Sequence, residues 1–467
     1  MERQKFGDGK KFTVSEVMDS WGVSRLPILV CIAVGFAIFF EGYDYMIVSY
    51  TMHQISAEWS LDSVVQGSLA SWGLIGMVIG GIVGGSIGDK IGRRKNLTIG
   101  ILWYSIFTGA IYFAPNYELF ALFRVVAGFG TGMCIPTCQT YIVEFAPSKK
   151  RGTFIAVVMA YMVAGWASAA VVSMLVIPAF GWRFCYLLGF IPFIFGVFLH
   201  FFMHESPQWL AMRGRLEEAC KELTWCQKIA TKGKDEYVFD PELLHVPIKA
   251  QGANALKMFS KPYIRTTIGL WLCHLCATFT VYGVNAWLPS LLLEKGYSLE
   301  GAYTLALIQN VAAVCANVSV GALNDILGRR KNLFIGFTCV ILACIACAFV
   351  ESPFPLVIFS MIFLGFAVNY ATTDVNSMVD ETYPTEFRNG ASGMTSAFGR
   401  FGGAIAPIVC GAVLAMNGTY AQTMLFFCLP AACGILVTLF IIKNENMHLS
   451  IDEIAARDLG IDVSPED

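Results

Sequence analysis

The chain has few charged residues for its length. Of its 467 residues only 14% are Asp, Glu, Lys or Arg, whereas 56% are hydrophobic. A soluble globular protein of this length carries more charge on its surface, so the composition excludes that class. The net charge is only −2, and no basic surface typical of a nucleic-acid-binding protein stands out. We therefore expect no nucleic acid partner.

Several chemical signatures are also missing. The 15 Cys residues mostly lie in apolar stretches, without the spacing of a metal site or the clustering of extracellular disulfides, which predicts buried free thiols. The glycines of RVVAGFGTG at 124–132 follow no strand and therefore do not form a dinucleotide loop. No nucleophile, base and orienting residue fall into a recognisable set. These absences predict no metal, no cofactor and no enzyme activity.

The chain instead contains a dozen apolar stretches, each long enough to cross about 30 Å of hydrocarbon as a helix. The mean hydropathy of +0.61 agrees with this interpretation. We predict an all-α polytopic membrane protein whose first span is retained, because the first 25 residues lack the pattern of a signal peptide. The predicted spans are 26–52, 64–87, 97–114, 118–143, 153–178, 184–203, 266–293, 300–323, 332–350, 354–379, 389–416 and 420–442.

The basic residues indicate how the chain is oriented. If the N-terminus is cytoplasmic, only Arg183 and Lys295 of the 32 Lys and Arg residues lie outside, and only Arg124 and Arg400 lie within spans. The asymmetry predicts that both termini are cytoplasmic. We expect a monomer in the cell membrane, plasma or inner, in contact with the lipid bilayer.

Two motifs occur twice at nearly the same offset. GDKIGRRKNL at 88–97 returns as NDILGRRKNL at 324–333, and EFAPSKKRG at 144–152 is echoed by ETYPTEFRNG at 381–390, with offsets of 236 and 237 residues. The shared offset indicates duplication of a six-span unit, and such parallel repeats place a substrate cavity near the bilayer midplane. The predicted domains are an N-terminal segment 1–25, a six-helix half 26–203, a linker 204–265 with amphipathic helices, a second six-helix half 266–442 and a cytoplasmic tail 443–467.

The repeated loop resembles the hallmark loop of the major facilitator superfamily. The resemblance covers essentially the whole chain and implies twelve transmembrane helices in two six-helix pseudo-repeats. It also implies a cytoplasmic latch, for which Asp89 accepts hydrogen bonds from basic groups and Gly92 permits a tight reversal. The alternative is that the basic residues only fix topology, and Ile326 in place of a basic residue weakens the second copy. The predicted gating residues are Asp89, Gly92, Arg93, Asp325, Arg329, Glu144, Arg151, Glu381 and Arg388.

Shorter motifs narrow the resemblance. HESPQWL at 204–210 is similar to the Pro-Glu-Ser-Pro-Arg-Trp-Leu stretch of sugar porters and several metabolite symporters, and 209–223 is predicted to form one amphipathic helix. The paired Gln of span 7 and the Pro-Glu-Thr-Lys-Gly that follow in sugar porters are absent. EGYD at 41–44 resembles the Asp-Gly-Tyr-Asp element of the aromatic acid:proton symporters. The resemblance implies proton-coupled transport.

The first span carries two carboxyl groups, Glu41 and Asp44, which are costly in hydrocarbon and are therefore functional candidates. At a rise of 1.5 Å per residue, Asp44 lies about 12 Å below the outer end of its span and Arg124 about 10 Å below that of span 4. We hypothesise that the two interact and that moving the arginine changes the proton affinity of the carboxylate. Asp44 is the first candidate for the proton carrier and Glu41 the second; the alternative is a fixed ion pair.

Arg400 in span 11 lies about 16 Å from the cytoplasmic end, close to the midplane. Gly399, Gly402 and Gly403 leave room beside it. The planar fork of an arginine binds a carboxylate with two hydrogen bonds, so Arg400 is the candidate anchor for an organic anion. Asp374 in span 10 is its resting partner, a second titratable site, or half of a permanent salt bridge without a ligand role.

Aromatic and amide side chains are candidates to line a cavity, because a flat substrate stacks on aromatic faces and an amide gives a directional hydrogen bond. Ordinary packing is the alternative for each of them. His274, beside Cys273 and Cys276, is predicted to be a buried neutral imidazole. The predicted substrate-binding residues besides Arg400 and Asp374 are Tyr43, Tyr282, Asn285, Trp166 and Tyr370.

Together these features predict a proton-coupled symporter of a small organic, probably aromatic, carboxylate that works by alternating access. A symporter of a sugar or an organic cation is the alternative within transport. A membrane sensor that binds a ligand without net flux is the alternative outside it, although the soluble segments are too short for a signalling domain.

Overall fold

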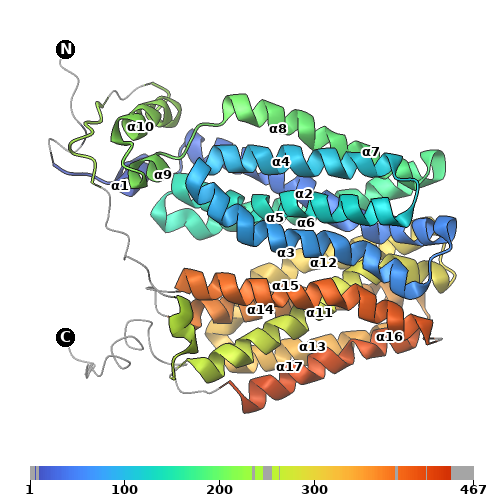
Figure 1. Ribbon diagram of the computed structural model, residues 1–467. Helices are drawn as coiled ribbons and strands as arrows, with labels where there is room; N and C mark the ends of the chain where they lie inside the picture. Colours follow the sequence, from blue (N-terminus) through green and yellow to red (C-terminus); the bar gives the residue numbers. More distant parts are fainter. Residues whose placement is uncertain are drawn as a thin grey trace. The chain divides into compact units, whose positions relative to one another are not determined.

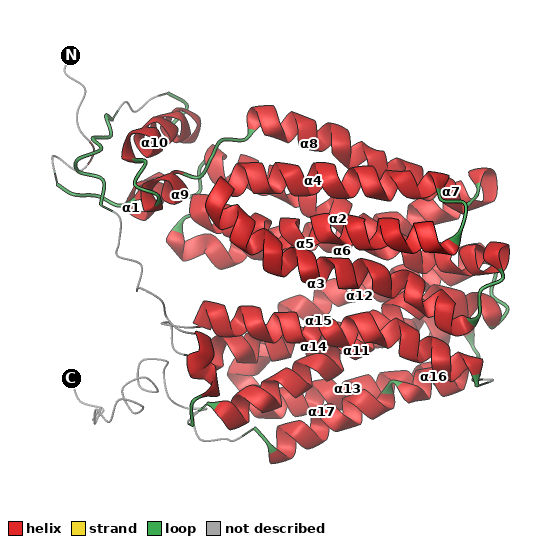
Figure 2. Ribbon diagram, viewed as in Figure 1, coloured by secondary structure: helices red, strands yellow, loops and turns green. Residues whose placement is uncertain are grey.

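The structure is a computed structural model of the chain and describes residue 6 and residues 10–233, 237–245, 255–261, 263–383, 388–416 and 418–442. Most of these residues are helical, as Figure 2 shows, and the β structure among them is one isolated bridge between Phe12 and Leu244. Twelve helical segments of the described chain are long and apolar enough to span a membrane (Figure 1). The predicted all-α polytopic fold is confirmed.

Each predicted span overlaps one of these segments. The helices extend beyond the apolar stretches by up to several residues, because backbone hydrogen bonding continues past the hydrophobic limit. The first six segments are α2 (Arg25–Trp59), α3 (Ser63–Ile91), α4 (Arg93–Ala110), α5 (Tyr117–Phe145), α6 (Arg151–Phe180), and α7 (Trp182–Leu187) with α8 (Ile191–Phe202). The second six are α11 (Ile264–Glu294), α12 (Leu299–Leu327), α13 (Arg329–Phe349), α14 (Phe354–Thr382), α15 (Arg388–Ala415), and α16 (Tyr420–Phe426) with α17 (Cys428–Phe440).

The chain forms two compact units. Unit 1 contains residues 1–47 and 75–249, and unit 2 contains residues 48–74 and 250–467. These units follow the two sequence repeats except at residues 48–74, where the end of α2 and the start of α3 group with the second repeat.

Close backbone packing explains why residues 48–74 belong to unit 2. A Cβ atom at Gly67 would overlap the carbonyl oxygen of Pro407, and one at Gly411 would overlap that of Ser63, so α3 and α15 meet without intervening side chains. The hydroxyl of Tyr303 on α12 also donates to the carbonyl of Tyr50 on α2. The ends of α2 and α3 are therefore fixed to unit 2 by both packing and hydrogen bonding.

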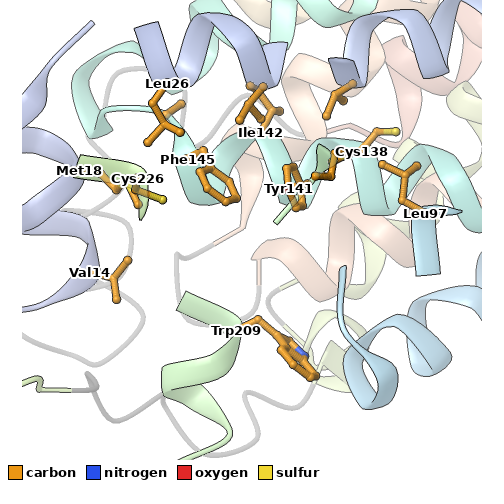
Figure 3. Packing of buried hydrophobic residues seen from close by; sticks show 14 of the residues in the cluster. Val14, Met18, Leu26, Leu97, Cys138, Tyr141, Ile142, Phe145, Trp209 and Cys226 are labelled. Atoms are coloured by element: carbon orange, nitrogen blue, oxygen red, sulfur yellow. The ribbon is translucent and has the colours of Figure 1, made fainter. Parts of the chain in front are cut away.

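A cap of shorter segments covers one end of unit 1. It comprises residues 12–21 with α1 (Val14–Trp21), α9 (Pro207–Met212), α10 (Leu216–Ala230) and residues 237–245. A capping box starts α1: the amide of Glu16 donates to Thr13 Oγ1 at 3.2 Å, and the amide of Thr13 donates to the Glu16 carboxylate at 2.9 Å. The cap and the helix ends share one hydrophobic cluster, in which Figure 3 shows Val14, Met18, Leu26, Phe145, Trp209 and Cys226.

The predicted amphipathic helix over 209–223 is wrong in one respect. It is two helices, α9 and α10, separated at Gly214, whose φ of +74° is a left-handed conformation that interrupts a right-handed helix. The apolar face nevertheless packs as expected, with Cys220 and Cys226 buried in the cluster. Burial raises the pKa of Cys220 to about 11, and it raises the pKa of Cys226 well above its usual value. All 15 cysteines are free, as predicted.

Candidate functional site

The predicted pair between α2 and α5 is present in unit 1. Arg124 Nη1 lies 3.2 Å from Asp44 Oδ1 and also donates to the backbone carbonyl of Asp44 at 3.2 Å. Both side chains are buried. A third group, the hydroxyl of Thr108 on α4, donates to the same carboxylate oxygen at 2.6 Å. Three helices therefore converge on Asp44, and the sequence analysis missed Thr108 because a threonine in a span carries no signal by itself.

The local packing of α2 places these groups. A Cβ at Gly42 would overlap the carbonyl of Met162, and one at Gly165 would overlap the carbonyl of Phe39, so α2 and α6 are in backbone contact on one side. Asp44, two residues after Gly42, then extends toward α4 and α5. Glycine at these positions keeps α2 close to α6.

Glu41 lies one turn before Asp44 and is only 2% exposed. Its charge acts on Tyr104, Cys134 and Cys138, which lie on α4 and α5. The two carboxyl groups thus face the same pair of helices at successive turns. The structure brings Glu41, Asp44 and Arg124 into one buried region, and their role in proton coupling stays a prediction.

The aromatic candidates of unit 1 differ in what their polar atoms do. Tyr43 is buried, and its hydroxyl donates to the backbone carbonyl of Cys185 at 2.7 Å, so it joins α2 to α7. Trp166 is partly buried, its ring lies 6.3 Å from that of Tyr45, and its indole nitrogen has no hydrogen-bond partner among the described residues. Trp166 is therefore the better placed of the two to donate to a ligand.

Arg400 of unit 2 is partly buried on α15. It makes no hydrogen bond or ion pair with any other residue that the structure describes. A guanidinium group in such a position is expensive unless an anion or water accompanies it. The chain has therefore left its donors available, as a substrate anchor requires.

Asp374 and Arg400 do not form an ion pair in this structure. Asp374 on α14 is fully buried, and Asn332 on α13 donates to its Oδ1 at 3.2 Å. Asn332 also donates to Asn324 at 2.8 Å and accepts from the hydroxyl of Tyr370 at 2.5 Å. Asp374 and Tyr370 thus belong to a polar network between α12, α13 and α14, and the ligand roles predicted for them remain untested.

The other two candidates of unit 2 lie along α11. Tyr282 packs against α15 at Gly403, where a Cβ atom would lie 2.5 Å from the ring. Asn285 is buried, and its side-chain oxygen accepts from Gln309 Nε2 on α12 at 3.1 Å. Tyr282 thus shares the α11 and α15 contact with Arg400, whereas Asn285 joins α11 to α12.

The first predicted latch is assembled in unit 1. Arg93 contacts Asp89 at 2.7 Å and Glu144 at 3.4 Å, which links α3, α4 and α5. Glu205, just before α9, accepts from the backbone amide of Arg93 at 2.8 Å, so a carboxylate occupies the N-terminus of α4. Trp209 Nε1 donates to the carbonyl of Asp89 at 2.9 Å. Glu205 and Trp209 were not predicted as site residues, although both lie in the HESPQWL motif.

The remaining gating candidates fall into two groups. Arg151 contacts Ser15 of α1 at 3.4 Å, so it joins the cap rather than Glu144. Arg329 begins α13 after Gly328, whose φ is +78°. The side chains of Asp325, Glu381 and Arg388 lie outside the described residues. The second latch is therefore described only through its backbone at Gly328 and Arg329.

The second arginine of each loop has the same partner in both units. Arg94 at the start of α4 donates to the carbonyl of His200 near the end of α8, with Nε at 3.1 Å. Arg330, 236 residues later, donates to the carbonyls of Thr438 and Leu439 at the end of α17, at 3.0 and 2.6 Å. A cation at a helix C-terminus satisfies free carbonyls and interacts favourably with the helix dipole. These two arginines are therefore helix caps.

We expect Gly92→Ala to destabilise the protein more than the same change at two other glycines. Gly92 has a φ of +103°, and a Cβ atom there would overlap the Glu205 carboxylate. Gly181 has a φ of +82° but open space around it, and Gly152 has open space and no positive φ. Left-handed strain costs about 1–2 kcal/mol, so thermal melting in detergent should rank the losses Gly92, then Gly181, then Gly152. Equal losses at Gly92 and Gly181 would mean that displacing Glu205 is harmless.

Comparison with known proteins agrees with this architecture. The Major Facilitator Superfamily profile matches residues 34–407 and 270–456. The "Niacin transporter NiaP" of Acinetobacter baylyi is 29% identical over 90% of this chain and 94% of its own length. The "4-hydroxybenzoate transporter PcaK" of the same organism is 27% identical over 88% and 90%. The xylose transporter XylE from E. coli, partially occluded and inward open, has a TM-score of 0.71 at 19% identity, covering 91% of this chain and 100% of that chain, which supports the fold.

The resemblance drawn from the repeated loops and from EGYD is confirmed by these matches, since the curated relatives include transporters of aromatic acids. The family profile covers most of the chain, including both repeats. This protein belongs to the Major Facilitator Superfamily and is a multi-pass membrane transporter.

Proposed function

We propose that this protein is a proton-coupled symporter of a small aromatic carboxylate. The observation that carries the proposal is the contrast between two buried arginines. Arg124 has a carboxylate partner in Asp44, whereas Arg400 has none among the described residues. An acid paired with a basic group suits proton exchange, and a guanidinium without an acid suits an anionic substrate.

The names of the relatives support a carboxylate substrate. They include transporters of niacin, 4-hydroxybenzoate, gallate, benzoate and cis,cis-muconate. All of these compounds carry a carboxylate and most carry an aromatic ring. Arg400 provides the charge that such compounds require, and Tyr282 on the neighbouring α11 provides an aromatic face.

In the proposed cycle, a proton that enters from outside neutralises Asp44 or Glu41. A neutral Asp44 holds Arg124 less strongly, and the substrate carboxylate neutralises Arg400. Because buried unpaired charges are costly, binding both the proton and the substrate lowers the cost of closing the protein over them. Without a nucleotide-binding loop in the sequence, the proton gradient supplies the energy.

The latch residues give the cycle a point of control. In unit 1, Asp89, Arg93 and Glu205 hold α3, α4 and the segment before α9 together, and opening inward would require these contacts to rearrange. We propose that this latch faces the cytoplasm, that both termini are cytoplasmic and that the protein acts as a monomer in the cell membrane.

Uptake into proteoliposomes tests the function. The substrates are benzoate, 4-hydroxybenzoate, succinate, glucose and choline, each measured with and without an inward proton gradient. We expect uptake of the aromatic carboxylates to increase when the gradient is imposed. Gradient-driven uptake of glucose or choline without uptake of the carboxylates would contradict the proposed substrate class, and carboxylate uptake insensitive to the gradient would contradict proton coupling.

A further inference from the structure

The contact between α11 and α15 contains a second polar group beside Arg400. His274 on α11 is 4% exposed, and its ring packs on Gly399, where a Cβ atom would lie 2.8 Å from the ring carbons Cδ2 and Cγ. Gly399 directly precedes Arg400 on α15. The absence of a side chain at Gly399 therefore creates the space that brings the imidazole next to the arginine.

The hydrogen-bonding capacity of this imidazole is not used. His274 Nδ1 has no hydrogen-bond partner among the described residues. The neighbouring hydroxyl of Thr278 donates to backbone carbonyls, at 2.5 Å to Gly399 and 2.7 Å to His274. The indole N–H of Trp271 donates to Thr395 Oγ1 at 3.0 Å. Buried polar atoms are normally paired, so an unpaired one beside an unpaired arginine indicates a ligand.

A metal does not explain the site. The described residues contain no group of three His, Cys, Asp or Glu side chains able to hold a metal ion. Cys273, the nearest thiol along the chain, contacts the carbonyl of Gly434 and the hydroxyl of Thr438 on α17. Among the described residues, the charge that acts on His274 is that of Arg400. The electrostatic environment therefore favours an anion with hydrogen-bond acceptors.

We infer that His274 and Arg400 form one receptor for the substrate carboxylate, an inference that rests on the proposed function. The guanidinium group of Arg400 binds the carboxylate, and in the tautomer with a proton on Nδ1 the imidazole of His274 donates to one of the carboxylate oxygens. Because every protein group at the receptor is then a donor, an acid fits it and a carboxamide does not. The NH₂ group of an amide would face a donor, which leaves buried polar groups unpaired.

The receptor makes His274 a residue that selects acids over amides. Losing one hydrogen bond to a charged group weakens binding by about 1.5–3 kcal/mol, or roughly tenfold to a hundredfold. The loss should be the same for every aromatic acid, because the carboxylate is the group they share. It should also be coupled to Arg400, since both residues contact the same ligand group.

Equilibrium binding to the purified full-length protein in detergent tests this inference. The probes are benzoate, 4-hydroxybenzoate and benzamide, measured by calorimetry for the wild type, His274→Leu and His274→Asn. Leucine removes the donor, whereas the asparagine amide can place an N–H near the position of Nδ1. We expect His274→Leu to raise Kd for both acids by a similar factor of roughly tenfold or more and to leave the weak binding of benzamide unchanged, with partial recovery in His274→Asn.

Each other outcome has a defined meaning. Wild-type binding of the acids with an unchanged Kd in both variants would overturn the inference and leave the proposed function intact. A loss confined to 4-hydroxybenzoate would show that His274 contacts the ring substituent, which also overturns it. Wild-type protein that binds neither acid would overturn the proposed function and the inference with it. If His274→Leu does not fold, His274→Asn combined with Arg400→Lys decides the matter, because independent effects of the two changes would contradict a shared receptor.

Discussion

Asp44→Asn is expected to abolish accumulation of substrate against its gradient while substrate binding and exchange persist. Asparagine has nearly the same shape as aspartate and can still accept from Thr108 Oγ1 and Arg124 Nη1, which lie 2.6 and 3.2 Å from the carboxylate. It cannot carry a proton. The coupling between proton and substrate is thereby removed, and the substrate can only equilibrate across the membrane.

The measurement compares two fluxes in proteoliposomes. Uptake driven by an imposed proton gradient should disappear, whereas exchange of labelled for unlabelled substrate should continue. Glu41→Gln is the matched control, because it removes the other buried carboxyl group one turn away. If Asp44→Asn still accumulates substrate and Glu41→Gln does not, Glu41 is the proton carrier. Accumulation by both variants would place proton coupling elsewhere.

Arg400→Lys is expected to weaken binding of aromatic carboxylates by about tenfold to a hundredfold, because lysine keeps the charge but loses the planar fork that makes two hydrogen bonds. Arg400→Ala should abolish measurable binding. Since Arg400 has no protein partner among the described residues, neither change breaks an existing ion pair, and the folded protein should retain its thermal stability.

Arg265→Lys is the matched control for this change. Arg265 is also in unit 2, and its guanidinium donates to the carbonyls of Ile441 and Phe440 after the end of α17, at 3.1 and 2.6 Å. We expect Arg265→Lys to lower the melting temperature without changing substrate affinity. Full affinity in Arg400→Lys would mean that Arg400 is not the bidentate anchor.

The sequence predicts positions along the membrane normal better than positions around a helix. The fixed rise per residue placed Asp44 and Arg124 at similar depth, and the structure pairs them. Depth does not reveal direction, and Arg400 and Asp374 lie on long helices whose facing sides depend on packing. The predicted resting pair is accordingly absent, and Asp374 binds Asn332 instead.

Residues missed from the sequence share a physical reason. Thr108 and Glu205 become part of a site only through contacts with residues 64 and 112 positions away. A threonine in a span is ordinary, and a glutamate in a loop is ordinary, so neither has a signal of its own. Glu205 lies in a recognised motif, and asking which helix N-terminus its carboxylate caps would have identified it.

The helix caps at Arg94 and Arg330 have a consequence for how the chain could be divided. Each arginine joins the first turn of the third helix of its repeat to the last turn of the sixth, and it does so without residues from the other repeat. A repeat whose first and last helices are tied in this way carries its own closure. Two separate polypeptides, divided between residues 245 and 263, should therefore fold when co-expressed and recover a working protein from its parts.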